Sequence, residues 1–221
     1  SSLRLIARFA RGRGEAKWLV EGWYNKKFDI NYQIYISPKG EVEVFSVKQQ
    51  LLRDTVYIGS VLPPRISGDI FEAYKEYGIT IGKYLYETGY TGVAGIDSII
   101  TEQDEIIPVV EINGRFTLST YISFIDQKLK DKKVLSRYFR FMPDKAVGYG
   151  ELLKVLEQQS ILISPENKEG VFIYTAGTLP YKLHEGSDYF VGRVFALIIS
   201  EDWSKIEEYN SKLENVISSF S

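Results

Sequence analysis

Apolar and polar residues take alternate positions along several stretches of this chain, and this pattern predicts β-strands. Between residues 28 and 36 every second position is apolar, namely Phe28, Ile30, Tyr32, Ile34 and Ile36. Successive side chains of a strand point to opposite faces, so one face of this stretch is predicted to be buried. The turn residues 37–40 and a second alternating run at 42–47 complete a predicted hairpin. Further strands are predicted at 18–20, 93–100, 106–113, 134–141, 170–174 and 189–199.

Other stretches repeat apolar residues at helical spacing. The clearest contains Ile70, Phe71, Tyr74, Tyr77, Ile81 and Leu85. It predicts a helix that ends by Gly89. Further helices are predicted at 3–11, 118–129, 151–158 and 203–217. The order of these elements predicts an α+β layout, or a mixed α/β one, in which helices pack on a mostly antiparallel sheet.

The composition narrows the class of protein without identifying it. The chain has 221 residues, of which 44% are hydrophobic and 25% charged, as in ordinary globular proteins with one large domain or two small ones. Its formal charge of −2 gives no reason to expect nucleic acid or a membrane surface as a partner. The absence of cysteine excludes disulfides, zinc–thiolate sites and thiol catalysis, and it suits a reducing compartment such as the cytoplasm. No apolar run approaches the roughly 20 residues that span a bilayer.

The second predicted hairpin carries the most informative polar pattern. Glu111, Asn113 and Arg115 occupy alternate positions and therefore share one face of a strand. If the turn is centred on Asp104, then Asp97 and Glu111 lie directly opposite each other. Opposed Cβ atoms of antiparallel strands are about 4.5–5.5 Å apart. Two carboxylates at that distance repel each other unless a cation lies between them or one of them binds a proton.

These residue types match the ligands that a hard cation prefers. Mg²⁺ binds carboxylate and amide oxygens together with phosphate oxygens and water, and Asp97, Glu111 and Asn113 offer the protein part of such a set. Gly95, opposite Asn113, is expected to leave room above the strand, and Arg115 adds a planar fork suited to a phosphate or carboxylate. The pattern therefore indicates a magnesium–phosphate site. The alternative is the polar outer face of an edge hairpin, on which Arg115 simply pairs with Glu111.

The hairpin resembles the metal-binding signature of the ATP-grasp superfamily. The matching residues are Gly95-Ile96-Asp97, then Glu111-Ile112-Asn113, then Arg115. This resemblance implies that Asp97, Glu111 and Asn113 bind Mg²⁺ against the phosphates of ATP. It also implies a catalytic role for Arg115, which in the carboxylase and peptide-ligase branches helps to bind the acceptor or the acyl-phosphate.

A second match lies upstream, in residues 18–24 (WLVEGWY), which resemble the hinge of the same family. The resemblance implies that backbone groups of Glu21 and Tyr24 pair with the adenine edge. Lys27 stands near the place where many relatives have a glutamate for the ribose hydroxyls, so Asp29 is the implied ribose ligand. The alternative for this segment is a plain buried strand and turn.

The resemblance covers roughly residues 3 to 128. It implies that residues 1–129 are the C-terminal part of an ATP-grasp domain, and that 130–221 are a small α/β extension like that of carboxylases and some peptide ligases. Two interpretations stay open for Lys48, Gln50 and Arg53, which either face the phosphates or substrate or form a solvated charged edge. The family's glycine-rich phosphate-covering loop is expected to precede residue 1, so the chain as given is expected not to turn over ATP.

The resemblance implies an ATP-dependent, magnesium-requiring carboxylate–amine ligase that acts through an acyl-phosphate. An amino acid or peptide ligase is favoured over a biotin-type carboxylase. The implied partners are a small-molecule carboxylate and an amine, without nucleic acid or membrane, and a second copy of the chain is a further candidate. Two other classes remain open. One is a noncatalytic ATP-grasp-like module that binds nucleotide or serves as a scaffold, and the other is an interaction protein with a merely polar hairpin.

Overall fold

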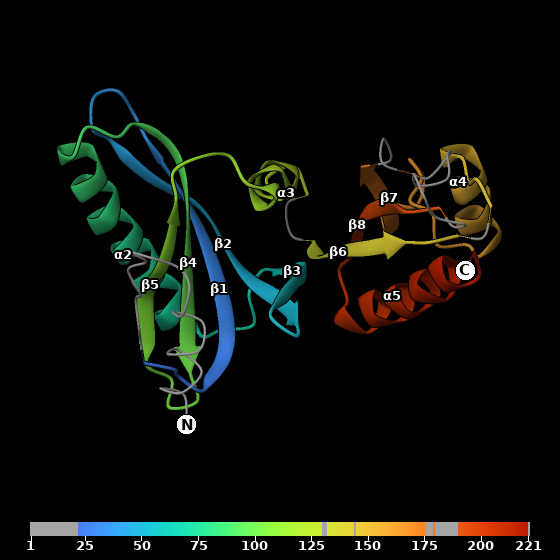
Figure 1. Ribbon diagram of the computed structural model, residues 1–221, viewed down its shortest axis with the longest axis horizontal. Coiled ribbons are helices and arrows are strands. Elements are labelled where there is room, and N and C mark those ends of the chain that lie inside the picture. Colours follow the sequence, from blue (N-terminus) through green and yellow to red (C-terminus); the bar gives the residue numbers. More distant parts are fainter. Residues whose placement is uncertain (1–21, 130–131, 144, 176–178, 180–189, 221) are drawn as a thin grey trace, which may run out of the picture.

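A computed structural model describes residues 22–129, 132–143, 145–175, 179 and 190–220. In this part of the chain, eight strands form one sheet in the order β5-β4-β1-β2-β3-β6-β8-β7, and all neighbouring strands are antiparallel. Figure 1 shows α2 against the β1–β5 end of the sheet and α4 and α5 at the other end. The predicted α+β class with a mostly antiparallel sheet is therefore confirmed. The helix predicted at 3–11 and the strand at 18–20 lie outside the described residues.

Most predicted elements are present, several with shifted bounds. In chain order they are β1 (Lys26–Ile36), β2 (Val42–Arg53), β3 (Val56–Leu62), α2 (Gly68–Glu87), β4 (Gly92–Thr101), β5 (Ile106–Asn113), α3 (Leu118–Asp126), β6 (Lys133–Phe141), α4 (Tyr149–Gln158), β7 (Gly170–Thr175), β8 (Gly192–Ser200) and α5 (Trp203–Ser218). The sequence pattern missed β3 and ended β2 six residues early, at Val47. Polar residues at 48–50 and a glycine at 59 break the alternation there, and glycine within a strand weakens the pattern. No helix in the described ranges is long and apolar enough to cross a membrane.

The apolar face of β1 forms the centre of the first core. Ile30, Tyr32 and Ile34 are fully buried and lie in a cluster with the apolar side chains of α2. Close packing of α2 on β2 depends on glycine, because a Cβ at Gly82 would lie 2.4 Å from Cγ1 of Val42. With this face committed to α2, the alternate residues of β1 project from the opposite face of the sheet.

The sheet continues without a break into the C-terminal half. β3 pairs with β6 from Gly59–Arg137 to Leu62–Val134. A second core lies among β6, β7, β8, α4 and α5, and a smaller apolar cluster joins Leu62, Ile122 of α3 and Val134 at the junction. The proposed boundary at residues 129 and 130 therefore falls in the connection between α3 and β6, and the two-domain division stays a prediction.

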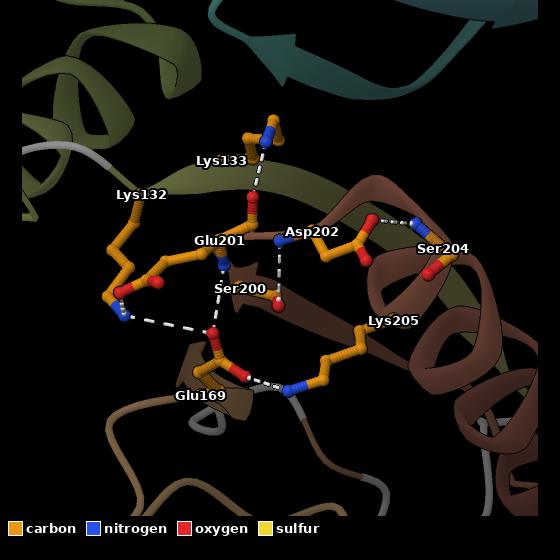
Figure 2. A network of polar contacts seen from close by, with 8 residues as sticks. All are labelled: Lys132, Lys133, Glu169, Ser200, Glu201, Asp202, Ser204 and Lys205. Atoms are coloured by element: carbon orange, nitrogen blue, oxygen red, sulfur yellow. Dashed lines mark hydrogen bonds and ion pairs between the residues drawn. The ribbon is translucent and has the colours of Figure 1, made fainter.

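A polar network ties together the ends of β6, β7, β8 and α5 (Figure 2). Glu169 accepts hydrogen bonds from the backbone N–H of Glu201 (2.9 Å) and from Nζ of Lys205 (2.9 Å). Lys132 lies 2.6 Å from the carboxylate of Glu201 and 3.7 Å from that of Glu169. The backbone hydrogen bond, then the Lys205 ammonium, lower the pKa of Glu169 to about 2. The carboxylate is thus ionised at neutral pH and holds the start of β7 against the start of α5.

We expect Gly59→Ala to destabilise the protein strongly. A Cβ at this position would lie 2.0 Å from the carbonyl oxygen of Ser136 in β6, and a backbone atom cannot rotate away. The strain should lower the free energy of unfolding by about 3 kcal/mol, as overpacking does in cores. Gly68→Ala is the matched control, because no atom lies within 4 Å of its Cβ position. Urea unfolding measures both, and equal midpoints for the two variants would contradict the close β3–β6 contact.

Candidate functional site

The face of the sheet opposite α2 carries a set of polar residues, which we call the polar face. On β1 it consists of Asp29, Asn31 and Gln33. Asn31 lies opposite Lys48 of β2 and opposite Asp97 of β4, so the polar positions continue across the sheet. α3 covers part of this face, because side chains of Asn31 and Gln33 contact its first turn.

The predicted register of the second hairpin is confirmed. Asp97 of β4 lies opposite Glu111 of β5, and Gly95 lies opposite Asn113. Asp104 in the turn has a φ of 60°, a left-handed conformation that aspartate tolerates better than most residues. Burial is the main reason that the pKa of Asp97 is raised above its ordinary value, and the nearby charge of Glu111 raises it further. The two acids therefore do compete electrostatically, as the sequence suggested.

Three amides surround the carboxylate of Asp97. Asn31 and Gln50 each donate to its Oδ1 at 2.8 Å, and Asn113 donates to its Oδ2 at 3.3 Å. The hydrogen bonds from Asn31 and Gln50 favour the ionised form and oppose the rise in pKa. The sequence pattern predicted no role for Asn31, although Asn31 alternates with Asp29 and Gln33 as the polar positions of one strand.

Asn113 and Arg115 form a pair at the end of β5. Nη2 of Arg115 donates to Oδ1 of Asn113 at 3.0 Å, and Nη1 donates to the carbonyl of Phe116 at 3.4 Å. The pairing of Arg115 with Glu111, expected if the hairpin were merely a polar edge, is absent from the ion pairs of the described residues. Arg115 is exposed, but the expectation that it shares the strand face of Glu111 and Asn113 is wrong, because β5 ends at Asn113 and the chain turns there.

The expected room above Gly95 is already filled. A Cβ at Gly95 would lie 2.6 Å from Nε2 of Gln33 and 3.5 Å from Cγ2 of Thr117. The glycine therefore admits the Gln33 amide and the residue before α3, and a bound ligand is not needed to explain it. The contact between Gln33 and Gly95 could not be predicted from the sequence, because β1 and β4 are distant in the chain.

The donor set around Asp97 fits a hard divalent cation. Asp97 and Glu111 supply two opposed carboxylates, and Asn113 supplies an amide oxygen from the same face. No cluster of three or more Asp, Glu, His or Cys occurs in the part of the chain that the structure describes, so phosphate oxygens and water would complete the coordination. Oδ1 of Asn113 is turned toward Arg115, and its use as a ligand requires a half-turn of the amide.

A groove of about 360 Å³, which we call the Trp23 groove, adjoins one end of the polar face. Asp29 and Gln50 line it, and Gln50 also contacts Asp97, so the groove borders the acid pair. Asp29 is held by Nζ of Lys26 at 2.6 Å. Tyr24 is half exposed, and Glu21, the other predicted adenine contact, lies outside the described residues.

A second groove of about 370 Å³, the Tyr35 groove, lies beyond the other end of the polar face. Its floor is Tyr35 of β1 with its register neighbours Glu43 and Val93. Its remaining lining residues are Phe45, Phe116, Phe124 and Gln127. Asp29 and Tyr35 are six residues apart on one strand, so the two grooves lie roughly 20 Å apart, with the acid pair between them.

Lys48 departs from both interpretations left open by the sequence. It is fully buried, and its Nζ donates to the carbonyl of Ser119 (2.7 Å) and to the hydroxyl of Ser123 (2.5 Å) in α3. Burial lowers its pKa to about 7, against the attraction of Asp126 and Asp97. Lys48 is therefore not part of a solvated edge, whereas Arg53 at the end of β2 is exposed.

This buried lysine predicts a pH dependence of stability. In the unfolded chain Lys48 keeps its proton up to about pH 10.4, whereas in the folded chain it loses it near pH 7. The unfolded state thus binds more protons between these values, and the free energy of unfolding should rise with pH by up to about 1.4 kcal/mol per unit. Urea unfolding between pH 7 and 9 measures this slope, and Lys48→Met should remove it. An unchanged slope in the variant would show that Lys48 titrates normally.

Comparisons with known proteins agree with this fold. No protein-family model matches the sequence. A [butirosin acyl-carrier protein]–L-glutamate ligase of Niallia circulans is 36% identical over 126 residues, which make up 56% of this chain and 30% of that ligase. The chain thus spans less than a third of this curated relative.

Two solved structures have a fold similar to that of this chain. N5-carboxyaminoimidazole ribonucleotide synthetase from Thermus thermophilus matches with a TM-score of 0.60 at 14% identity, over 90% of this chain and 53% of that one. The biotin carboxylase domain of the Hydrogenobacter thermophilus 2-oxoglutarate carboxylase, solved with MgADP, ADP and bicarbonate, matches with a TM-score of 0.57 at 12% identity, over 85% of this chain and 45% of that one. The fold of the chain is therefore similar to that of ATP-grasp ligases.

Proposed function

We propose that this chain is the C-terminal part of an ATP-dependent carboxylate–amine ligase that requires magnesium and forms a C–N bond through an acyl-phosphate. The observation that carries the proposal is the opposed pair Asp97 and Glu111, with Asn113 on the same strand face and Arg115 in contact with Asn113. Two carboxylates held this close, one of them half-buried, are explained by a cation that neutralises both. The position of this pair between two grooves suits an enzyme that brings two substrates together.

We assign the nucleotide to the Trp23 groove. The indole of Trp23 is 85% exposed, so it offers an apolar surface for an adenine ring, and Asp29 is the proposed ribose ligand. When Asp29 binds the ribose hydroxyls, its ion pair with Lys26 would either remain or be replaced by the bonds to ribose. In this arrangement Gln50 lies between the nucleoside and the pair of Asp97 and Glu111, and its amide donates a hydrogen bond to Asp97. We keep the backbone of Glu21 and Tyr24 as proposed adenine contacts.

Asp97, Glu111 and Asn113 would hold Mg²⁺ at the phosphate end of this groove. The cation supplies charge neutralisation at the phosphate that is transferred. The hydrogen bonds from the amides of Asn31 and Gln50 favour the ionised form of Asp97 and would orient it for this purpose. Arg115, exposed at the end of β5, would bind the acceptor carboxylate and then its acyl-phosphate through two parallel hydrogen bonds.

We assign the apolar part of the acceptor to the Tyr35 groove. Tyr35, Phe116 and Phe124 are 40%, 58% and 46% exposed, and aromatic side chains left this open commonly line ligand sites. The curated relative is named as a ligase of an acyl-carrier protein and L-glutamate. We therefore propose an amino acid or peptide as one substrate of this chain, and a carrier-linked acyl group as a candidate for the other.

The main alternative is a noncatalytic ATP-grasp module that binds nucleotide or acts as a scaffold. The ionisable pair and the exposed Arg115 favour catalysis over this alternative, because a scaffold gains nothing from opposed carboxylates. We also propose a cytoplasmic location, since a chain without cysteine suits a reducing compartment, and we keep a homodimer as a proposed assembly.

Nucleotide titration of the full-length protein that contains this chain tests the proposal. We expect ADP to bind with Mg²⁺ at least tenfold more tightly than with EDTA, and Trp23→Ala to weaken binding by about tenfold, the value of one lost stacking contact. Trp203→Ala, in the distant helix α5, is the control and should bind normally. Nucleotide binding without ATP-dependent ligation would favour the scaffold, and no binding would reject both. The 221 residues alone are expected not to ligate.

A further inference from the structure

Hydrogen bonds link six residues, from Lys48 to Arg115, across the polar face, and one of these links passes through the main chain of Ser119. The main-chain carbonyl of Ser119 accepts from Nζ of Lys48, and the hydroxyl of the same serine donates to Oδ1 of Asn31 at 2.8 Å. Nδ2 of Asn31 donates to Asp97 at 2.8 Å. On the far side, Asn113 donates to Asp97 and accepts from Arg115. The order is thus Lys48, Ser119, Asn31, Asp97, Asn113 and Arg115.

A second branch strengthens the link between α3 and Asn31. The hydroxyl of Thr120 donates to Oε1 of Gln33 at 2.8 Å, and Nε2 of Gln33 donates to Oδ1 of Asn31 at 2.7 Å. Oδ1 of Asn31 therefore accepts one hydrogen bond from Ser119 of α3 and one from Gln33 of β1, whose own amide oxygen accepts from Thr120 of α3. These hydrogen bonds fix the amide of Asn31 so that its nitrogen, and not its oxygen, faces Asp97. The position of α3 thus sets the orientation of an amide that holds the candidate metal ligand.

Lys48 is one of the residues that hold α3 against the sheet. Its side chain is fully buried between β2 and α3, and its ammonium donates to two groups of α3. No carboxylate of the described residues lies within ion-pair distance of this ammonium. Burial of a charge without a close ion pair is costly even when Asp126 and Asp97 attract it from further away, and an apolar side chain of similar length would be the more stable choice.

We propose that Lys48 is a positioning residue of the active site, which clamps α3 to β2 and thereby orients Asn31 and Asp97 for the bound metal and nucleotide. This inference rests on the proposed function, since it assigns the orientation of Asp97 to metal binding. It differs from a direct phosphate contact, because the ammonium points into α3. Groups that hold metal ligands from behind commonly change metal affinity by 10- to 100-fold when they are removed.

The test uses the full-length protein with Mn²⁺ and ADP as probes, and electron paramagnetic resonance to count free Mn²⁺. Lys48→Met removes the ammonium and keeps a side chain of similar length. Ser119→Ala removes the hydroxyl bond to Asn31 but leaves the carbonyl that accepts from Lys48. We expect each variant to weaken Mn²⁺ binding by about tenfold. Lys75→Met on the exposed side of α2 is the control and should bind as the wild type does.

The double variant decides whether Lys48 and Ser119 act along one path. If they do, Lys48→Met with Ser119→Ala should bind Mn²⁺ only as weakly as Lys48→Met alone, whereas independent effects would multiply to about 100-fold. Melting temperatures distinguish the proposed positioning role of Lys48 from a merely structural one. A merely structural role predicts that Lys48→Met is less stable than the wild type but binds Mn²⁺ with unchanged affinity. Unchanged affinity or multiplying effects would overturn the inference alone. A wild type that binds no Mn²⁺ with ADP would overturn the proposed function, and with it this inference.

Discussion

Glu111→Gln is expected to abolish ligation by the full-length enzyme while leaving its fold intact. The substitution removes one of the two anionic ligands from a site that faces a dication, and a neutral amide of the same shape replaces it. Loss of one such electrostatic group commonly lowers turnover by about 10²- to 10³-fold. Without magnesium the variant should be as stable as the wild type or slightly more so, because the repulsion between Glu111 and Asp97 is relieved.

Two measurements on Glu111→Gln separate these effects. Thermal melting without ligand should show an unchanged or raised midpoint, and addition of Mg²⁺ with ADP should no longer raise it. Glu105→Gln is the matched control, since Glu105 is exposed in the turn of the same hairpin. Near wild-type turnover in Glu111→Gln would show that the metal assignment is wrong. A fall in stability without magnesium would show that Glu111 serves the fold instead.

The sequence predicted the hairpin of β4 and β5 well because its contacts are local. A turn at Asp104 fixes which residues oppose each other, and simple counting from it pairs Asp97 with Glu111. The alternation of apolar residues similarly located β1 and its buried face. Such features depend on neighbours in the chain, so periodicity and turn residues are sufficient to find them.

The surroundings of Asp97 could not be predicted in this way, because they depend on the order of strands in the sheet. β1 lies between β2 and β4, so Asn31 reaches a carboxylate 66 residues away in sequence. Lys48 was misjudged for a related reason, since lysine is usually exposed and only the return of α3 over β2 buries it. The filled space above Gly95 likewise results from contacts between strands distant in sequence.

Arg115→Lys is expected to impair ligation far more than nucleotide binding. Arg115 lies two residues beyond Asn113, where the chain turns after the end of β5 and the backbone N–H of Arg115 donates to the carbonyl of Asn113 at 2.8 Å. Its guanidinium contacts Asn113, a proposed metal ligand, and we therefore expect the acceptor and its acyl-phosphate to bind beside the proposed metal. Lysine keeps the positive charge but loses the planar fork that binds a carboxylate or phosphate through two hydrogen bonds. We expect a loss of about 100-fold in ligation rate, with nucleotide affinity changed by less than about threefold.

The contact between Arg115 and Asn113 makes this prediction sharper. Nη2 of Arg115 donates to Oδ1 of Asn113, which is the oxygen that the cation would need. This hydrogen bond would therefore have to break both when the metal binds and when Arg115 binds the acceptor. Two assays measure the effects of Arg115→Lys separately. ADP titration with Mg²⁺ gives the nucleotide affinity, which should change little. The ligation rate with L-glutamate and a carrier-linked acyl substrate should fall. Arg53→Lys, at the exposed end of β2, is the control and should change neither quantity. Equal losses in both assays would move Arg115 into the nucleotide site. Loss in neither would reduce it to the partner of Asn113 at a strand end, and would remove the acceptor site from this face of the sheet.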